Sequence, residues 1–423
     1  MVTRPRDSAG GPPPTPGVRA SMRFVRFAML CGLLCLLQVA SVVVLVASFH
    51  QPWTALAGAW SVSCAAAILI AKWRVSRARD SAGRRPLVDA ARLVTISTAV
   101  SLGLFMWPGV STSDVRPDHR ATRLRVAGGE LAVRTIRATV QKRPPLVALH
   151  GGPGVPFTEA EERALSGLAV DRDIVIYDQI GVGDSSRLSE PHEYSLRRAV
   201  DDLVAVVAAT GMPKVSILGY SWGAQVATVY AAEHPDRVAE LVLMSPGFFP
   251  WQGRPLRPGL PQSRLTLPQK AYAYGLAVKP RNLFVYMLVG ADPDVARWFA
   301  SDAEMDARFA ELFAASEPAT FCDRRSRSAK PSGLGFYAGQ VPQQHPGLDG
   351  VTRAEVPGLG SVRTLILRGG CDYIPMSAAN DYRDVMPGSR LVDVRDAGHA
   401  LLEDAGPEVV ATVRAFLQTP SQP

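Results

Sequence analysis

The stretch LGYSWGAQV (218–226) holds a serine, Ser221, between two glycines in a Gly-x-Ser-x-Gly pattern. A serine hydroxyl becomes a nucleophile when a base lies within hydrogen-bonding reach and a carboxylate orients that base. The pattern alone is weak, because glycine and serine are abundant. It predicts a nucleophile when a strand precedes it, a helix follows it, and an acid and a histidine come later in the chain.

The base should be a histidine that follows the serine, and His345 and His399 are the two that follow it late enough. His345 lies in QQHPG, which is typical of a turn. His399 lies in DAGHALLED, between an expected strand and the final expected helix, where a loop can bring a side chain over the edge of a sheet. We therefore predict that His399 is the base.

The acid should follow the strand that precedes the histidine. TLILRGGCDYIP (364–375) supplies Asp372 directly after an apolar run, with two glycines that allow a tight turn. Asp393 and Asp396 are weaker candidates, because they lie within or at the end of the next strand. The structural alternative for Asp372 is a helix cap. The resulting order of serine, acid and histidine is the one expected on a mostly parallel sheet.

Two backbone N–H groups are expected to stabilise the oxyanion of an acyl transfer. HGGPG (150–154) follows the apolar run PPLVALH, and its glycines permit a close approach of the backbone. We predict the N–H groups of Gly152 and of Trp222, the residue after the nucleophile, as the donors. A glycine-rich turn could instead hold a phosphate, but no Gly-Lys-Ser/Thr follows.

Short apolar runs alternate with helical patterns between residues 120 and 423, which predicts an α/β fold with a mostly parallel, doubly wound sheet. The serine falls where one such strand ends and a helix begins. A hairpin is expected at 123–140, and further strands at 144–150, 173–178, 214–220, 239–244, 364–369 and 390–398; helices are expected at 196–210, 223–234 and 407–418.

One long interruption, at about 247–362, breaks this alternation. It holds proline-rich stretches and amphipathic helical segments such as DAEMDARFAELFAAS (302–316). We interpret it as a helical lid over the edge of the sheet that carries the carboxyl ends of the strands.

The first quarter of the chain is predicted to be a membrane region. Its apolar runs are long enough for membrane spans, although burial in a protein core is the alternative, most of all for the third. We expect a basic, proline-rich disordered tail at 1–22, a membrane region at 23–109 with spans near 27–49, 53–71 and 88–108, and a linker at 110–119.

Basic residues flank these apolar runs and explain much of the net charge of +8, so we expect a lipid bilayer rather than nucleic acid as the partner. The tail and the loop KWRVSRARDSAGRR are rich in Lys and Arg, whereas the HQPW turn has neither. The positive-inside rule then places the N-terminus in the cytoplasm and the hydrolytic part outside. If the third run does not cross, that part faces the cytoplasm.

The five cysteines fit either topology. Cys31, Cys35 and Cys64 lie in the apolar runs and should behave as small hydrophobic residues. Cys322 and Cys371 lie in the later part of the chain and could form a disulfide in an oxidising compartment. The sequence leaves this pairing open.

Together these motifs resemble the α/β-hydrolase fold and are similar, more narrowly, to the prolyl aminopeptidase (proline iminopeptidase) family of serine peptidases. The resemblance covers roughly residues 120–420. It implies the catalytic roles named above and release of an N-terminal residue, often proline, through an acyl-enzyme. The segments that carry it are HGGPG (150–154), DQIGVGDSS (178–186), GYSWGA (219–224), RGGCDYIP (368–375) and DAGHALLED (396–404).

Two departures concern the substrate. Ile180 stands where the family usually has the arginine of DQRG, and the Trp-x-x-Trp-Glu context of an amine-binding lid glutamate is not found. Among the lid carboxylates, Glu304 and Glu311 are seven residues apart and would share a helix face, so we assign them to substrate binding. A solvated helix face is the alternative explanation.

The sequence therefore predicts a membrane-anchored serine hydrolase, aminopeptidase-like, that acts outside the cytoplasmic membrane on a peptide or small acyl substrate. It should need no metal or organic cofactor. One alternative is an esterase or other acyl hydrolase of the same fold. Another is a catalytically silent, membrane-tethered binding module.

Overall fold

The computed structural model describes residues 16–76, 86–107, 120–254, 261–326, 332–347 and 350–419. The chain divides into two units, Met1–Trp107 and Pro108–Pro423. The expected linker at 110–119 and residues 1–15 of the expected tail lie outside the described residues.

The first unit consists of three helices that pack on one another: α1 (Pro16–Phe49), α2 (Pro52–Ser76) and α3 (Pro86–Ser101), which a π-helical turn, η1 (Leu102–Met106), continues. Helix α1 begins at Pro16, inside the segment predicted as a tail, because proline suits the first helical position. Three stretches are long and apolar enough to cross a membrane: Phe24–Phe49, Pro52–Trp73 and Leu87–Met106. The third therefore reaches a spanning length, as the expected topology requires.

Polar side chains meet inside this helical unit. The Gln38 side-chain amide donates to the Thr98 hydroxyl at 2.9 Å, and the Ser101 hydroxyl donates to the Gln38 side-chain oxygen at 2.7 Å. Such bonds between α1 and α3 satisfy polar groups that water cannot reach in a bilayer. The same unit buries Cys31 and Cys35, and the thiols of both, like that of Cys64, are free.

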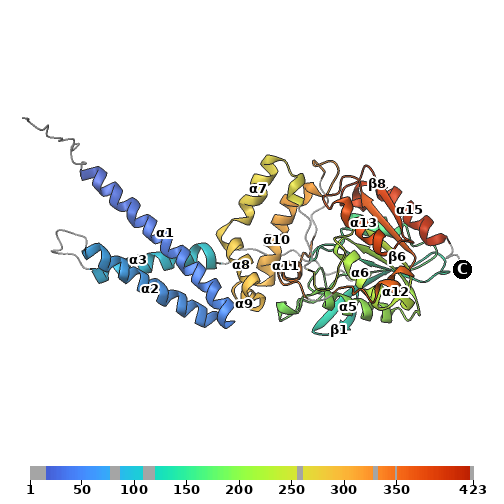
Figure 1. The fold of residues 1–423 in the computed structure, drawn as a ribbon, viewed down its shortest axis with the longest axis horizontal. Helices are drawn as coiled ribbons and strands as arrows, with labels where there is room; N and C mark the ends of the chain where they lie inside the picture. The colour runs from blue at the N-terminus through green and yellow to red at the C-terminus, as the bar shows by residue number, and fades with distance from the viewer. Residues whose placement is uncertain are drawn as a thin grey trace, which may run out of the picture. The chain divides into compact units, whose positions relative to one another are not determined.

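The second unit is built on one eight-stranded sheet in the order β1-β2-β4-β3-β5-β6-β7-β8 (Figure 1). The β1–β2 and β2–β4 pairs are antiparallel and the other pairs are parallel, which confirms the predicted mostly parallel sheet. The strands are β1 (Thr122–Val126), β2 (Gly129–Ile136), β3 (Leu146–Leu149), β4 (Ile174–Tyr177), β5 (Val215–Tyr220), β6 (Val238–Met244), β7 (Thr364–Gly369) and β8 (Arg390–Val394).

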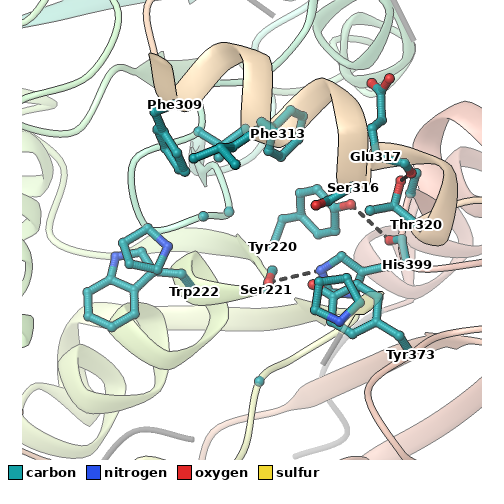
Figure 2. A pocket seen from close by; sticks show the side chains of 18 of the residues that line it. Tyr220, Ser221, Trp222, Phe309, Phe313, Ser316, Glu317, Thr320, Tyr373 and His399 are labelled. Atoms are coloured by element: carbon teal, nitrogen blue, oxygen red, sulfur yellow. Dashed lines mark hydrogen bonds between the residues drawn. The ribbon is translucent and has the colours of Figure 1, made fainter. Parts of the chain in front are cut away.

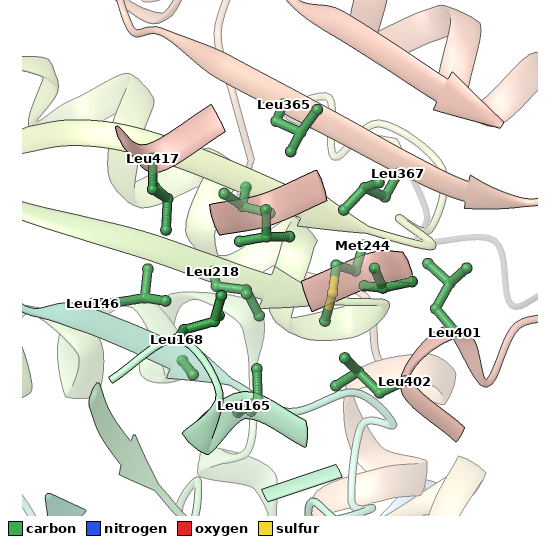
Figure 3. Close-up of a cluster of buried hydrophobic side chains, with 14 of the residues drawn as sticks. Leu146, Leu165, Leu168, Leu218, Met244, Leu365, Leu367, Leu401, Leu402 and Leu417 are labelled. Carbon is green, nitrogen blue, oxygen red and sulfur yellow. The ribbon is translucent and has the colours of Figure 1, made fainter. Parts of the chain in front are cut away.

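Alternate residues of the central strands build the core on one face of the sheet (Figure 3). Because side chains of a strand alternate between its faces, pairs two residues apart point the same way, such as Leu146 and Ala148, or Leu365 and Leu367. The intervening residues are buried as well, so both faces must be covered. This explains why these strands read as continuous apolar runs.

Helices cover the two faces. On the face of Figure 3 lie α4 (Glu159–Ser166), α14 (Leu401–Asp404) and α15 (Gly406–Gln418), which pack on one another. Helix α6 (Trp222–Glu233) packs against β3, β5 and β6 and also contacts α5 (Leu196–Ala209). The remaining elements here are α13 (Met376–Val385) and the short turns η2 (Pro191–Glu193) and η3 (Pro235–Arg237).

The expected lid is a helical layer between β6 and β7, to one side of the sheet in Figure 1. It contains η4 (Pro261–Arg264), α7 (Leu267–Ala277), α8 (Pro280–Ala291), α9 (Pro293–Phe299), α10 (Asp302–Ser316), η5 (Glu317–Ala319) and α11 (Phe336–Gln344). The last helix of the predicted range, α12 (Val356–Gly360), packs on α6 instead. The lid is therefore shorter at its C-terminal end than the sequence indicated, because this segment already returns to the sheet.

A disulfide joins Cys322, just after η5, to Cys371, in the loop after β7, with the two Cα atoms 5.2 Å apart. The two residues are 49 positions apart in the sequence. The pairing that the sequence left open is thus formed, and it ties the end of the lid helices to the loop that holds Asp372.

Reduction of this bond should destabilise the second unit, because it restores the chain entropy of a long loop in the unfolded state. For a loop of this size the effect amounts to about 4 kcal/mol. Thermal unfolding of the full chain in detergent should shift to lower temperature when dithiothreitol is added. The C322S/C371S variant should have a lower melting temperature than the wild type, with or without reductant. A wild-type melting temperature that does not change when dithiothreitol is added would contradict the prediction.

Candidate active site

Ser221 occupies a tight turn between β5 and α6, with a backbone φ of 54°. The turn can form because its flanking glycines lack side chains. A Cβ at Gly219 would lie 2.4 Å from the Gly223 carbonyl oxygen, and a Cβ at Gly223 would lie 2.6 Å from the carbonyl oxygens of Leu149 and His150. The Gly-x-Ser-x-Gly pattern is therefore a steric requirement of the turn, which lifts the serine side chain above the edge of the sheet.

The structure brings the three predicted catalytic residues together. The Ser221 Oγ lies 3.0 Å from His399 Nε2, and His399 Nδ1 lies 3.0 and 3.1 Å from the two carboxylate oxygens of Asp372 (Figure 2). All three side chains are buried. The Asp372 carboxylate also accepts the backbone N–H of Ile374 at 2.8 Å, which fixes its orientation. This is the arrangement of nucleophile, base and orienting acid that acyl transfer needs.

The backbone and ring of His399 are held from several sides. Its carbonyl oxygen accepts the Tyr220 hydroxyl at 2.8 Å and the Ser245 hydroxyl at 3.1 Å. The Tyr373 ring lies beside the imidazole, with centroids 4.5 Å apart. These contacts limit the imidazole to orientations near the serine, and neither tyrosine was singled out from the sequence.

The two expected oxyanion donors line the same pocket as Ser221. Trp222 is the first residue of α6, so its N–H has no acceptor within the helix and is available to a negative charge. Gly152 lies in the loop after β3, and a Cβ on the neighbouring Gly151 would lie 3.1 Å from the Ser221 Cβ. The assignment of both N–H groups to an oxyanion hole remains a prediction.

His150 holds this loop in place. Its Nε2 accepts the backbone N–H of Gln179 at 3.0 Å, and the Gln179 side chain donates to the His150 carbonyl oxygen at 2.8 Å. Burial lowers the pKa of His150, which keeps the ring neutral and able to accept that bond. The Gln179 oxygen in turn accepts the Trp222 indole N–H at 3.0 Å, so the loop and the start of α6 are joined.

The pocket above Ser221 has a volume of about 550 Å³. Lid helix α10 lies over it and contributes Phe309 and Phe313 (Figure 2). Helices α7 and α8 add Tyr274 and Tyr286. Most of the lining is thus aromatic or aliphatic, which suits an apolar group on the substrate.

One wall of the pocket carries three carboxyl groups, Glu161, Glu317 and Glu403. Thr158 joins two of them: its N–H donates to Glu161 at 2.7 Å, and its hydroxyl donates to Glu403 at 2.8 Å. Burial raises the pKa of Glu161 to about 8, and burial together with the nearby charge of Glu317 raises the pKa of Glu403. The sequence did not point to this group, because its members come from three distant segments.

The two lid carboxylates assigned to substrate binding do not line the pocket, and this corrects the sequence-based assignment. Glu304 is buried in an ion pair with Arg281, at 2.7 Å, and also contacts Arg308 at 2.9 Å. Glu311 lies at the surface, 3.3 Å from Lys279. Both carboxylates are therefore paired with basic residues of the lid, outside the pocket.

The rejected alternatives for base and acid also have other contacts. His345 Nε2 lies 2.6 Å from the carbonyl oxygen of Val289 within the lid. Asp393 is partly exposed and pairs with Arg368 at 3.2 Å. Ile180, in place of the family's usual arginine, is buried beside the sheet.

The chain belongs to the α/β-hydrolase fold family, because the model of that family matches residues 144–406. It is an enzyme fold with an intact set of catalytic side chains, which supports a hydrolase. Among curated relatives, the proline iminopeptidase of Heyndrickxia coagulans is 36% identical over 102 residues, which is 24% of this chain and 35% of that protein. The cis-3-alkyl-4-alkyloxetan-2-one decarboxylase of Shewanella oneidensis is 24% identical over 279 residues, or 64% of this chain and 81% of that protein.

Among solved structures, the proline iminopeptidase of Mycobacterium smegmatis aligns with a TM-score of 0.47 at 18% identity, over 70% of this chain and 97% of that one. An esterase of Exiguobacterium antarcticum aligns with a TM-score of 0.47 at 19% identity, over 71% of this chain and 100% of that one. The chain spans only about a third of the length of the iminopeptidases it matches in sequence.

Removing members of the triad should affect reaction with an active-site fluorophosphonate in a graded way. The probe should label the wild type, should not label S221A, and should label D372N about ten-thousandfold more slowly, because the imidazole loses its orienting carboxylate. Asp393→Asn, a change of the same type on the neighbouring strand, should label at the wild-type rate. Unlabelled wild-type protein would favour the silent binding module.

Proposed function

We propose that the protein is a membrane-anchored serine hydrolase that works through an acyl-enzyme. The observation that carries this proposal is the hydrogen-bonded chain from the Ser221 Oγ through the imidazole of His399 to Asp372. His399 Nε2 takes the serine proton as Oγ attacks the substrate carbonyl carbon. The N–H groups of Gly152 and Trp222 stabilise the oxyanion that forms.

The imidazolium then gives its proton to the leaving group, and the bond between the carbonyl carbon and that group breaks. Water, deprotonated by the same imidazole, attacks the acyl-enzyme and releases the acid, which regenerates the serine hydroxyl. Asp372 holds the ring and stabilises its positive charge in both halves of the reaction. Nucleophile and base both come from the chain, so the proposed reaction uses no metal or organic cofactor.

We further propose that the substrate is a peptide with a free N-terminal amine, from which the enzyme releases the first residue. The carboxyl groups of Glu161, Glu317 and Glu403 support this, because a cationic amine is the natural partner for clustered acids in a pocket. An ammonium group nearby would also favour the ionised form of these buried carboxyls. The short similarity to proline iminopeptidases points to the same class.

The second candidate is an ester or other neutral acyl substrate. Phe309, Phe313 and Tyr286 favour it, since the largest part of the lining is apolar. The two candidates differ in one chemical requirement, namely the charge on the substrate's amine.

Blocking the amine should therefore distinguish them. Proline β-naphthylamide should be hydrolysed, whereas its N-acetyl derivative should not, because the blocked nitrogen carries no charge for the acidic wall. E317Q and E403Q should raise KM for the free amine roughly tenfold, as expected when a charged hydrogen bond is weakened.

Two comparisons control this experiment. Glu311→Gln, which changes a lid carboxylate outside the pocket, should leave KM unchanged. A short p-nitrophenyl ester should be hydrolysed equally by the wild type and by the two pocket variants. Equal turnover of the free and blocked amides would instead support the acyl-hydrolase candidate.

We propose that the hydrolase unit lies outside the cytoplasmic membrane. The segment before the first apolar run and the loop after α2 are rich in Lys and Arg, whereas the turn between α1 and α2 has neither, and this asymmetry supports the orientation. The Cys322–Cys371 disulfide supports it too, because disulfides are typical of an oxidising compartment.

Protease added to spheroplasts should degrade residues 120–423 while the cells remain intact, because the proposed orientation exposes this unit. Immunoblotting for the C-terminus would follow the digestion, with a cytoplasmic protein as the control for lysis. A C-terminal unit that stays protected until the membrane is permeabilised would overturn the orientation.

A further inference from the structure

The outer side of the lid presents large apolar side chains to solvent. We call this surface the outer lid face and define it by exposed residues of α7, α8 and the turn between them: Leu267, Tyr272, Tyr274, Val278, Leu283 and Met287. Leu267 is 80% exposed, Tyr272 65% and Val278 61%. Such exposure of clustered apolar side chains is unusual for a surface that faces only water.

Five of these residues follow the periodicity of their helices, and Tyr272 lies apart from the α7 stripe. Leu267, Tyr274 and Val278 stand at positions i, i+7 and i+11 and so form one stripe along α7 and its C-terminal cap. Leu283 and Met287 are four residues apart on α8. The opposite side of α7 packs on α10 through Ala273 and Leu276, which are buried. The outer lid face is therefore the side of α7 and α8 that is directed away from the packed interior of the lid.

The segment that contains α7 and α8 has basic residues but no acidic residues. From Leu241 to Ala291 the sequence contains no Asp or Glu, although the whole chain has 38 of them. The same stretch has six basic residues: Arg254, Arg257, Arg264, Lys270, Lys279 and Arg281. Arg281 is buried against Glu304, and Lys279 is exposed and pairs with Glu311 of α10 at 3.3 Å, whereas Arg254 is exposed.

Exposed apolar side chains and tyrosines, in a segment that has basic residues and no acids of its own, together match the chemistry of an anionic lipid surface. Apolar residues enter the boundary of the acyl chains, tyrosines suit the headgroup level, and basic residues near the surface attract the anionic headgroups. A protein partner of ordinary surface composition would give no reason to exclude acids over so long a segment.

The chain also limits how far the start of the hydrolase unit can be from a bilayer. Trp107 ends the third apolar helix and Thr122 begins β1, and the residues between them can extend over at most roughly 55 Å. If the apolar helices cross a membrane, the hydrolase unit stays at its surface at a high effective concentration. A weak affinity for lipid is then enough to hold one face against it.

We propose that the outer lid face rests on the anionic bilayer in which the chain is anchored. This inference depends on the proposed anchoring by the first unit. Three residues of α7 line the pocket, namely Ala273, Tyr274 and Ala277. Of these, Tyr274 also belongs to the outer lid face. The pocket therefore reaches the side of the lid that meets lipid, and the substrates served best carry an apolar group that partitions into the bilayer.

Site-specific photocrosslinking to lipid tests this contact. The full chain would be reconstituted in phosphatidylcholine vesicles with a quarter phosphatidylglycerol and a trace of tagged phosphatidylglycerol. p-Benzoylphenylalanine would replace Val278 on the outer lid face, Trp60 on the exposed side of α2, or Val140, which is exposed at the far end of the sheet. Labelling of Ser221 by a fluorophosphonate would show that each variant is folded.

The proposal expects lipid crosslinks at positions 60 and 278, with at least fivefold less at position 140. Omitting phosphatidylglycerol from the vesicles, with tagged phosphatidylcholine as the probe, should reduce crosslinking at position 278 and leave position 60 unchanged. Crosslinks at position 60 alone would overturn the lid contact while leaving the anchoring intact. Crosslinks at neither position would overturn both, and a crosslinked protein dimer at position 278 would identify the face as an interface between copies.

Discussion

The left-handed backbone at Ser221 is the constraint on which the rest of the active site depends. A non-glycine residue at φ 54° costs on the order of 1–3 kcal/mol, so the turn persists only where its surroundings enforce it. The Ser221 N–H donates to the Met244 carbonyl oxygen on the neighbouring strand, and the Ala224 N–H donates to the Ser221 carbonyl oxygen. These hydrogen bonds to the central sheet and to the start of α6 stabilise the turn and hold the Ser221 side chain towards the pocket.

A second set of contacts makes the lid and the catalytic loops one structure. The carbonyl oxygen of Thr320, at the end of the lid helices, accepts the N–H of Ala400, next to the catalytic histidine. The Asp404 carboxylate accepts the N–H groups of both Gly398 and Cys322. The disulfide then joins Cys322 to the loop of the catalytic acid. Any movement of this end of the lid must therefore act on the histidine and the acid together.

The pocket combines two kinds of chemistry that the proposed function uses separately. Its lid side is aromatic and suits an apolar group, and its wall beside α4 carries carboxyls, buried for Glu161 and Glu317 and partly buried for Glu403, that favour a cation. Burial keeps the pKa of Glu161 near 8, so its carboxyl is mostly neutral at pH 7 until a positive charge arrives. An amine and an apolar side chain on one small substrate would meet both surfaces, and the outer lid face would draw such amphiphilic molecules from the bilayer.

The strands of the sheet, the lid, the apolar helices and the triad of Ser221, Asp372 and His399 could be predicted from the sequence. This was possible because each depends on local signals: apolar periodicity, glycines at a tight turn, and side chains placed directly after strands. Which carboxylates line the pocket depends instead on how the helices pack. Glu304 and Glu311 share a helix with pocket residues, but Glu304 pairs with Arg281 and Glu311 pairs with Lys279. The acidic wall is assembled from three segments that meet only after folding, and no spacing in the sequence encodes that meeting.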